Sequence, residues 1–175
     1  RGIVVILGLD SWDGDGVDDI SDGTASAQII NRFVHALQYL ADGEKFMQEN
    51  ATKPGVKTTA SGMQYKTIEA GTGKTPGPQD QVTVNYRGTL IDGSEFDSSY
   101  KRGKPATFRL DKVIKGWTEG LQLVKEGGKI QLVIPPELAY DRGPMAHRTL
   151  IFDVELISVG GGKQAQSTRG EKAGE

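Results

Sequence analysis

The amino-acid sequence predicts an α+β fold with one strand-rich sheet, one short helix within that region and a longer helix before it. Three patterns lead to this prediction. Apolar and polar residues alternate with a period of two over 82–90, 130–134 and 150–156, which is typical of half-buried strands. A single short helix-like stretch, Trp117–Val124, lies between these strands. Apolar residues recur every three or four positions over 24–50, which is the period of an amphipathic helix.

The helix predicted over 24–50 has one apolar stripe. Thr24 or Ser26 is suited to cap its first turn, because a side-chain oxygen there can accept a hydrogen bond from a backbone N–H. Gly43 interrupts the pattern, and Pro54-Gly55 ends any helix. The stripe consists of Ile29, Ile30, Phe33, Val34, Leu37, Leu40 and Ala41, and it resumes with Phe46 and Met47.

The strands predicted after this helix end at turn signals. The strand over 82–90 ends before Asp92-Gly93, a turn dipeptide. The strand over 130–134 stops at Pro135-Pro136, because proline cannot donate a hydrogen bond to a neighbouring strand. A sheet of this kind can bury one face against a single amphipathic helix, which gives the α+β class. A first short strand is indicated by Met63, Tyr65 and Ile68.

These elements divide the 175 residues into four predicted segments, which are too few residues for two full-sized domains. Residues 1–23 form an acidic, Gly-rich N-terminal segment. Residues 24–57 form a helical arm or linker, and 58–159 form the principal domain. Residues 160–175 begin with three glycines and are mainly polar. This composition predicts a disordered tail, because little apolar surface is available to offset the loss of chain entropy on ordering.

The composition excludes several kinds of site. The chain is 36% hydrophobic and 25% charged with a formal net charge of −2, and it has no basic run dense enough to bind nucleic acid. It has no cysteine, which excludes disulfides, thiolate catalysis and Cys-ligated zinc. The only histidines, His35 and His147, lie far apart, which argues against a His-based metal site and a catalytic triad. The longest apolar run, 3–9, is far shorter than the roughly 20 residues of a membrane span.

The acidic stretch 11–22 has two interpretations. Its aspartates and one glycine are spaced nearly as in an oxygen-ligand calcium loop, and DGDGVDD resembles the calcium repeats of thrombospondin type 3 and dockerin modules. Ser11 stands at the first ligand position, however, and Trp12 does not fit the pattern. A solvated acidic linker explains the stretch equally well, so no metal site is predicted. The residues concerned are Asp13, Asp15, Gly16, Asp19 and Asp22.

Four segments of the principal domain carry a family resemblance. They are VTVNYRGTLIDGSEFDSSY (82–100), VIKGWTEGLQLVKEGGK (113–129), IPPELAY (134–140) and TLIFDVELISV (149–159). In this order and at this spacing they resemble the FKBP family of peptidyl-prolyl cis–trans isomerases. The lead-in GEKFMQENATKPGVKTTASGMQYKTIEAGTG (43–73) is similar to the bacterial macrophage infectivity potentiator (Mip)-like subgroup.

The resemblance implies a twisted antiparallel β-sheet wrapped on one short helix. In the Mip-like subgroup a helix joins the catalytic domain to an N-terminal dimerisation module. This implies a homodimer formed through the helix in 24–57. Residues 1–23 do not match that module, which weakens the implication.

The resemblance also implies a pocket for a proline ring. The Ile114 backbone N–H and the Tyr140 hydroxyl would hold the flanking carbonyls. Asp97 would polarise the site, and Arg102 would keep Asp97 ionised through a charge-assisted hydrogen bond. The catalytic residues implied are Tyr86, Phe96, Asp97, Trp117 and Tyr140. The substrate-binding residues implied are Arg102, Phe108, Val113, Ile114 and Phe152.

Some of these residues also have purely structural interpretations. Tyr86 points inward on a strand, and Phe108 is mainly a core candidate. Asp97-Ser98-Ser99 can form a turn through side-chain to backbone hydrogen bonds. The pair of Asp97 and Arg102 can be a structural ion pair without a catalytic role.

The sequence departs from the family pattern at the rim of the implied pocket. The loop DRGPMAHR (141–148) is shorter than its usual counterpart and lacks apolar residues that normally cover the pocket. Either Met145 substitutes for them, or the rim is more open and less selective. Ala106 stands where some relatives have an aromatic residue.

The implied reaction is rotation about the X-Pro amide in protein substrates, which assists folding. Its uncatalysed barrier is about 18–20 kcal/mol, and no bond is broken. An apolar pocket lowers this barrier because the twisted amide is less polar than the planar one, so no cofactor, metal, acid or base is expected. The alternative is a non-catalytic peptide-binding or chaperone module on the same fold. The resemblance further implies proline-containing polypeptides and rapamycin-type macrolides as ligands, and the periplasm or cell envelope as the location, with the cytoplasm left open.

Overall fold

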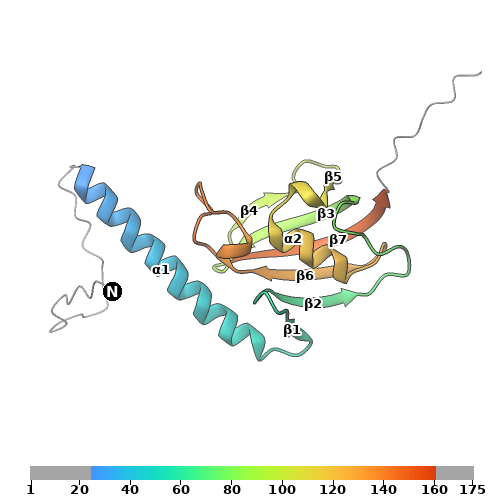
Figure 1. Ribbon diagram of the computed structural model, residues 1–175, viewed down its shortest axis with the longest axis horizontal. Coiled ribbons are helices and arrows are strands. Elements are labelled where there is room, and N and C mark those ends of the chain that lie inside the picture. The colour runs from blue at the N-terminus through green and yellow to red at the C-terminus, as the bar shows by residue number, and fades with distance from the viewer. Residues whose placement is uncertain (1–24, 161–175) are drawn as a thin grey trace, which may run out of the picture. The chain divides into compact units, whose positions relative to one another are not determined.

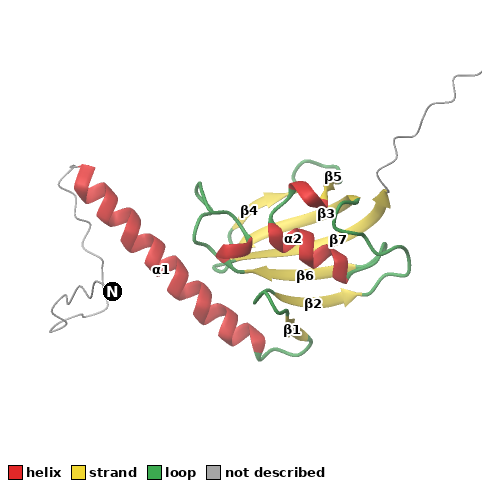
Figure 2. Ribbon diagram, in the orientation of Figure 1, coloured by secondary structure: helices red, strands yellow, loops and turns green. Residues whose placement is uncertain are grey.

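The computed structural model describes residues 25–160, which form one long helix, an antiparallel sheet and a short helix packed on that sheet (Figures 1 and 2). The predicted segment 1–23, with its calcium-like stretch, and residues 161–175 lie outside the described part of the chain. The elements are α1 (Ala25–Ala51), β1 (Val56–Thr58), β2 (Gln64–Glu69), β3 (Gln81–Leu90), β4 (Glu95–Ser98), β5 (Ala106–Arg109), the 3₁₀ turn η1 (Leu110–Lys112), α2 (Lys115–Gly120), η2 (Leu121–Leu123), β6 (Lys129–Ile134), η3 (Pro136–Leu138) and β7 (Leu150–Gly160).

The strands form a single sheet in which every neighbouring pair is antiparallel. The strand order is β1-β2-β6-β7-β3-β4, and β5 also pairs with β3. The long central pair is β3 with β7, in register from Gln81 opposite Gly160 to Leu90 opposite Leu150. This architecture confirms the predicted α+β class with an N-terminal helix. None of the helices within residues 25–160 has the length and apolar character to span a membrane.

One face of the sheet carries the hydrophobic core. The period-two alternation of β3, β6 and β7 places every second side chain on this face. The short helix α2 and the turn η2 cover it, as Figure 1 shows. The residues that the three strands contribute to this core are Val82, Val84, Tyr86, Ile130, Leu132, Ile134, Leu150, Phe152, Val154 and Leu156.

Two glycines bring α2 close to β6. A Cβ atom at Gly116 would stand 2.5 Å from Ile134 Cγ2, and one at Gly120 would stand 2.5 Å from Leu132 Cδ1. These distances are too short for real carbon–carbon contacts, so any larger residue would push the helix away. The two glycines are four residues apart and therefore lie on the same face of the helix. The close approach brings Trp117, between them in the sequence, into the core.

The C-terminal half of α1 is fixed to the sheet by buried polar contacts. Asn50 Nδ2 donates to Gln64 Oε1 at 2.8 Å, and Gln64 Nε2 donates to the Met47 carbonyl at 2.7 Å. Gly43 does not interrupt the helix. A side chain at this position would collide with the hydroxyl of Thr149, so glycine permits the helix to pack directly on the residue that precedes β7.

Gly120→Ala is expected to destabilise the protein. Alanine favours a helix over glycine by about 1 kcal/mol, but overpacking a tight core costs about 1–3 kcal/mol. The expected result is a lower urea midpoint with an unchanged m-value. Adding Leu132→Val is expected to offset part of the loss relative to Leu132→Val alone, because it removes the atoms that the new methyl group meets. A stabilising effect of Gly120→Ala in the wild-type background would contradict the packing argument.

Candidate functional site

Four aromatic side chains meet above the centre of the sheet, with Trp117 in the middle. The centroid of its ring lies 5.1 Å from that of Tyr86, 5.3 Å from Phe152 and 5.5 Å from Phe108. All three interplanar angles are between 87° and 89°. Edge-to-face contacts of this kind stabilise by about 0.5–1.5 kcal/mol each beyond burial of area. The four rings therefore hold one another in a fixed arrangement.

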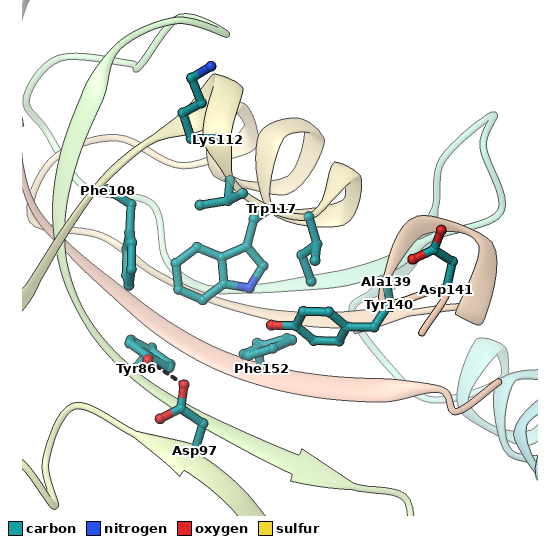
Figure 3. Close-up of a pocket in the computed structure, with 11 residues that line it drawn as sticks. Tyr86, Asp97, Phe108, Lys112, Trp117, Ala139, Tyr140, Asp141 and Phe152 are labelled. Carbon is teal, nitrogen blue, oxygen red and sulfur yellow. Dashed lines mark hydrogen bonds between the residues drawn. The ribbon is translucent and has the colours of Figure 1, made fainter. Parts of the chain in front are cut away.

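These rings form the floor and walls of a pocket of about 490 Å³ (Figure 3). The pocket lies between α2 and the sheet and is bounded by the segment after η3, where Tyr140 extends across its mouth in Figure 3. The lining residues are Tyr86, Asp97, Phe108, Lys112, Val113, Ile114, Trp117, Ala139, Tyr140, Asp141 and Phe152.

A compact hydrogen-bonded trio lies at one side of the pocket. The Tyr86 hydroxyl donates to Asp97 Oδ2 at 2.5 Å, and this bond is dashed in Figure 3. Arg102 donates from Nη1 to Asp97 Oδ1 at 2.6 Å and from Nη2 to the Tyr86 hydroxyl at 2.5 Å. The backbone N–H of Ser98 also donates to Asp97 Oδ1. The carboxylate is thus oriented from three sides.

The trio sets the protonation of its members. Burial alone would raise the pKa of Asp97, but the hydrogen bonds from Tyr86 and Arg102 outweigh it and hold this pKa below its ordinary value. Burial raises the pKa of Tyr86, and its bond to the Asp97 carboxylate raises it further. Burial, followed by the charge of Asp97, raises the pKa of Tyr140. At neutral pH Asp97 is therefore ionised, and the phenols of Tyr86 and Tyr140 are neutral.

The local sequence explains how Asp97 reaches the pocket. Gly88 of β3 lies opposite Asp97 of β4 and opposite Phe152 of β7. A Cβ at Gly88 would stand 2.7 Å from Phe96 and 2.9 Å from Phe152, so only glycine lets these rings cross the strand. The register shifts immediately after Gly88, and such a bulge re-aims neighbouring side chains.

Two hydrogen-bond donors belong to residues that line the pocket. The Trp117 indole N–H is buried and has no hydrogen-bond partner among residues 25–160. A buried donor without an acceptor costs about 1–3 kcal/mol, which a bound acceptor would recover. The second donor is the backbone N–H of Ile114. It lies at the start of α2, where N–H groups have no intrahelical acceptor.

Eight of the ten residues singled out in the sequence line this pocket, and two lie behind it. Phe96 packs its ring on Phe152 with centroids 5.5 Å apart, and Arg102 reaches Asp97 from outside. The eight lining residues are Tyr86, Asp97, Phe108, Val113, Ile114, Trp117, Tyr140 and Phe152. Their functional roles stay predictions.

Three lining residues were not foreseen from the sequence. Lys112, Ala139 and Asp141 line the pocket, and each is the immediate chain neighbour of a residue that was singled out. Their positions follow from the turns η1 and η3, which bring short stretches of backbone to the rim. The signal available in the sequence was that each of them is adjacent to a predicted site residue.

The short loop 141–148 contributes little to the rim. Of its residues only Asp141 lines the pocket, whereas Met145 packs against the hydrophobic core. Tyr140, just before the loop, is 41% exposed. Near the end of the loop His147 adopts a φ of 63°, a left-handed conformation that non-glycine residues rarely adopt.

Two family models match this chain. The model described as FKBP-type peptidyl-prolyl cis-trans isomerase matches residues 72–157, and the domain amino terminal to FKBP-type peptidyl-prolyl isomerase matches residues 25–67. FKBP-type peptidyl-prolyl cis-trans isomerase FkpA of Escherichia coli K12 is 55% identical over 123 residues, which cover 68% of this chain and 46% of that protein. Outer membrane protein MIP of Legionella longbeachae is 52% identical over 124 residues, covering 68% of this chain and 53% of that protein. The chain spans about half the length of these curated relatives.

Solved structures agree with these matches. The crystal structure of Escherichia coli FkpA superposes with a TM-score of 0.75 at 49% identity, covering 78% of this chain and 66% of that one. The crystal structure of a peptidyl-prolyl cis-trans isomerase from Pseudomonas syringae pv. tomato superposes with a TM-score of 0.64 at 40% identity, covering 71% of this chain and 95% of that one. The resemblance seen in the four sequence segments is confirmed, and the chain belongs to the family of FKBP-type peptidyl-prolyl cis-trans isomerases.

Proposed function

We propose that this chain catalyses cis–trans isomerisation of X-Pro bonds in protein substrates. The observation that carries the proposal is the pocket in which Tyr86, Phe108, Trp117 and Phe152 converge. A proline ring is a compact apolar group without an N–H, so rigid aromatic walls can bind it with little loss of side-chain entropy.

The chemistry requires the pocket to favour a twisted amide over a planar one. Rotation breaks the amide resonance and reduces the charge separation between oxygen and nitrogen. Water solvates the polar planar amide better than the less polar twisted amide. An apolar site has less of this preference, so it stabilises the twisted state relative to the ground state. Proton transfer is unnecessary, which suits a site in which the Asp97 carboxylate is fixed by hydrogen bonds and the phenols of Tyr86 and Tyr140 are neutral.

The polar groups would orient the substrate. The indole N–H of Trp117 and the backbone N–H of Ile114 are donors for substrate carbonyls, and the Tyr140 hydroxyl lies at the rim. The Asp97 carboxylate, fixed by Tyr86 and Arg102, would supply a constant negative field beside the rotating bond. We also propose that rapamycin-type macrolides bind in the same pocket.

An exposed apolar face on α1 supports a further part of the proposal, a homodimer. Ile29 and Phe33 are 66% and 65% exposed, and Ile30 and Leu37 are about half exposed. Their spacing places them on one side of the helix. A second copy of this chain is the partner we propose for this face, because a contiguous exposed apolar patch is typical of a surface that binds another protein.

The proposed location is the periplasm or cell envelope. The support is a relative named outer membrane protein MIP, which is 52% identical to this chain. The cytoplasm is the alternative. Fractionation of the native host, with the protein followed by antibody, separates the two.

Trp117→Leu is expected to lower kcat/KM for isomerisation of a proline tetrapeptide by roughly 30-fold. The reason is the loss of about 2 kcal/mol of ring contact in the pocket floor. Tyr100→Leu is the matched control, since Tyr100 is an exposed aromatic residue outside the pocket. It should leave kcat/KM unchanged.

Circular dichroism and thermal melting establish that the Trp117→Leu variant is folded. A folded variant with wild-type kcat/KM would contradict the assignment of the pocket. Suppression of aggregation by the wild-type protein, without acceleration of the tetrapeptide, would instead favour the non-catalytic chaperone alternative.

Asp97→Asn is expected to flatten the acid limb of the stability profile. The pKa of Asp97 in the folded protein lies below its unfolded value of about 3.9. Its ionised form therefore adds stability that is complete above about pH 4 and is lost as pH falls through the lower folded pKa. Urea unfolding between pH 6 and pH 2.5 measures this loss.

Arg102→Gln provides the companion measurement to Asp97→Asn. It removes a partner that lowers the Asp97 pKa, so the folded pKa moves toward the unfolded value and the acid-linked loss of stability should be smaller than in the wild type. An acid limb that is identical in the wild type and both variants would contradict the role given to this trio.

Phe33→Glu is expected to reduce the mass of the assembly from dimer to monomer. A charge in the centre of a buried apolar face has no partner and is costly to desolvate. Gln28→Glu is the control, because residue 28 lies on the opposite side of the same helix. Sedimentation velocity at tens of micromolar decides the question, and a monomeric wild-type chain would refute the dimer.

A further inference from the structure

A groove separate from the proline pocket lies between residues 40–51 of α1 and the segment that begins η3. It encloses about 510 Å³ and shares no lining residue with the pocket. Its apolar lining comes from both sides, with Leu40, Met47 and Ala51 from the helix and Pro135 and Pro136 from the end of β6 and the start of η3. Such a trough suits an extended chain segment with apolar side chains.

The charged residues that line this groove are all acidic. Its charged lining residues are Glu44 and Glu137, one on each side, and it has no basic lining residue. Both carboxylates are exposed, and neither forms an ion pair with any residue in the range 25–160. Two unpaired carboxylates beside apolar walls favour a segment that combines apolar residues with lysine or arginine.

The groove wall is preformed. The buried contacts of Gln64 with Asn50 and with the Met47 carbonyl fix the helix at one end of the groove. The close packing of Gly43 on Thr149 fixes it near the other. A ligand would therefore not have to order the helix on binding, which removes a large entropic cost.

The turn η3 connects the groove to the pocket. Glu137 lines the groove, and Ala139 and Tyr140 line the pocket. Tyr140 is three positions after Glu137, so their Cα atoms are at most about 11 Å apart. About three residues of an extended substrate span this distance.

We propose that the groove binds the substrate segment that flanks the isomerised proline, and that it selects apolar segments carrying lysine or arginine. This inference rests on the proposed isomerase function, because it gives the pocket an extended substrate. It predicts that affinity depends on residues several positions away from the proline.

The test compares three peptides on the wild-type protein and on the double variant E44K/E137K. One peptide is a tetrapeptide with a single X-Pro bond. The other two extend it by six residues containing leucine and lysine, one on the N-terminal side and one on the C-terminal side. In the wild type, one of the two extensions is expected to lower KM about tenfold at low salt, because two exposed charge pairs and apolar contact are gained.

In E44K/E137K this gain is expected to vanish, whereas kcat/KM for the tetrapeptide stays within twofold of the wild type. Replacing lysine by glutamate in the extension should restore the gain for the variant. Glu49→Lys is the matched control, because Glu49 lies on the same helix outside the groove and changes the net charge in the same direction. It should retain most of the gain.

Three results would overturn the proposal. The first is that neither extension lowers KM in the wild type. The second is that Glu49→Lys abolishes the gain as completely as E44K/E137K. The third is that E44K/E137K changes the mass of the assembly, which would make a second copy of this chain the occupant of the groove. Fluorescence anisotropy of the labelled lysine peptides keeps the test independent of catalysis. If the tetrapeptide is not isomerised at all, the function proposed for the pocket fails, while charge-dependent peptide binding would still locate a site in the groove.

Discussion

The packing of Trp117 against three other rings is the interaction on which the site depends. Its position is fixed from behind by the contact of α2 with β6, where Gly116 and Gly120 leave no space between helix and sheet. The same ring closes the hydrophobic core on one side and forms the pocket floor on the other. Core stability and pocket shape are therefore set by the same contacts, and neither can change alone.

The strand β3 links this core to the polar side of the site. Tyr86 contributes its ring to the cluster and its hydroxyl to Asp97. The register of β3 with β7 sets the position of the Tyr86 ring, and the bulged pairing of β3 with β4 sets the position of the Asp97 carboxylate. The electrostatic and apolar parts of the pocket thus share one strand, and sheet geometry sets where both of them lie.

The sequence was sufficient for the parts of the fold that have a clear period. The alternation in β3, β6 and β7 and the three- and four-residue spacing in α1 correspond to elements of the structure. The strands β1, β4 and β5 have only three or four residues each, too few to show a period, and they were missed. Phe96 illustrates a second limit. Its motif predicted a catalytic residue of the pocket, whereas in the structure its ring crosses β3 at Gly88 and packs on Phe152 without lining the pocket. The boundaries of the predicted domains stay predictions.

The division between floor and rim has a consequence for how such a protein can diverge. The floor is made by packed elements that tolerate little change in volume, whereas the segment between η3 and β7 contributes Ala139, Tyr140 and Asp141 to the rim and none of residues 142–149 to the lining. Insertions or deletions in 142–144, before the core contact of Met145, can accumulate without disturbing the rings. A change of length in this loop therefore alters the opening of the pocket and leaves its packed floor in place.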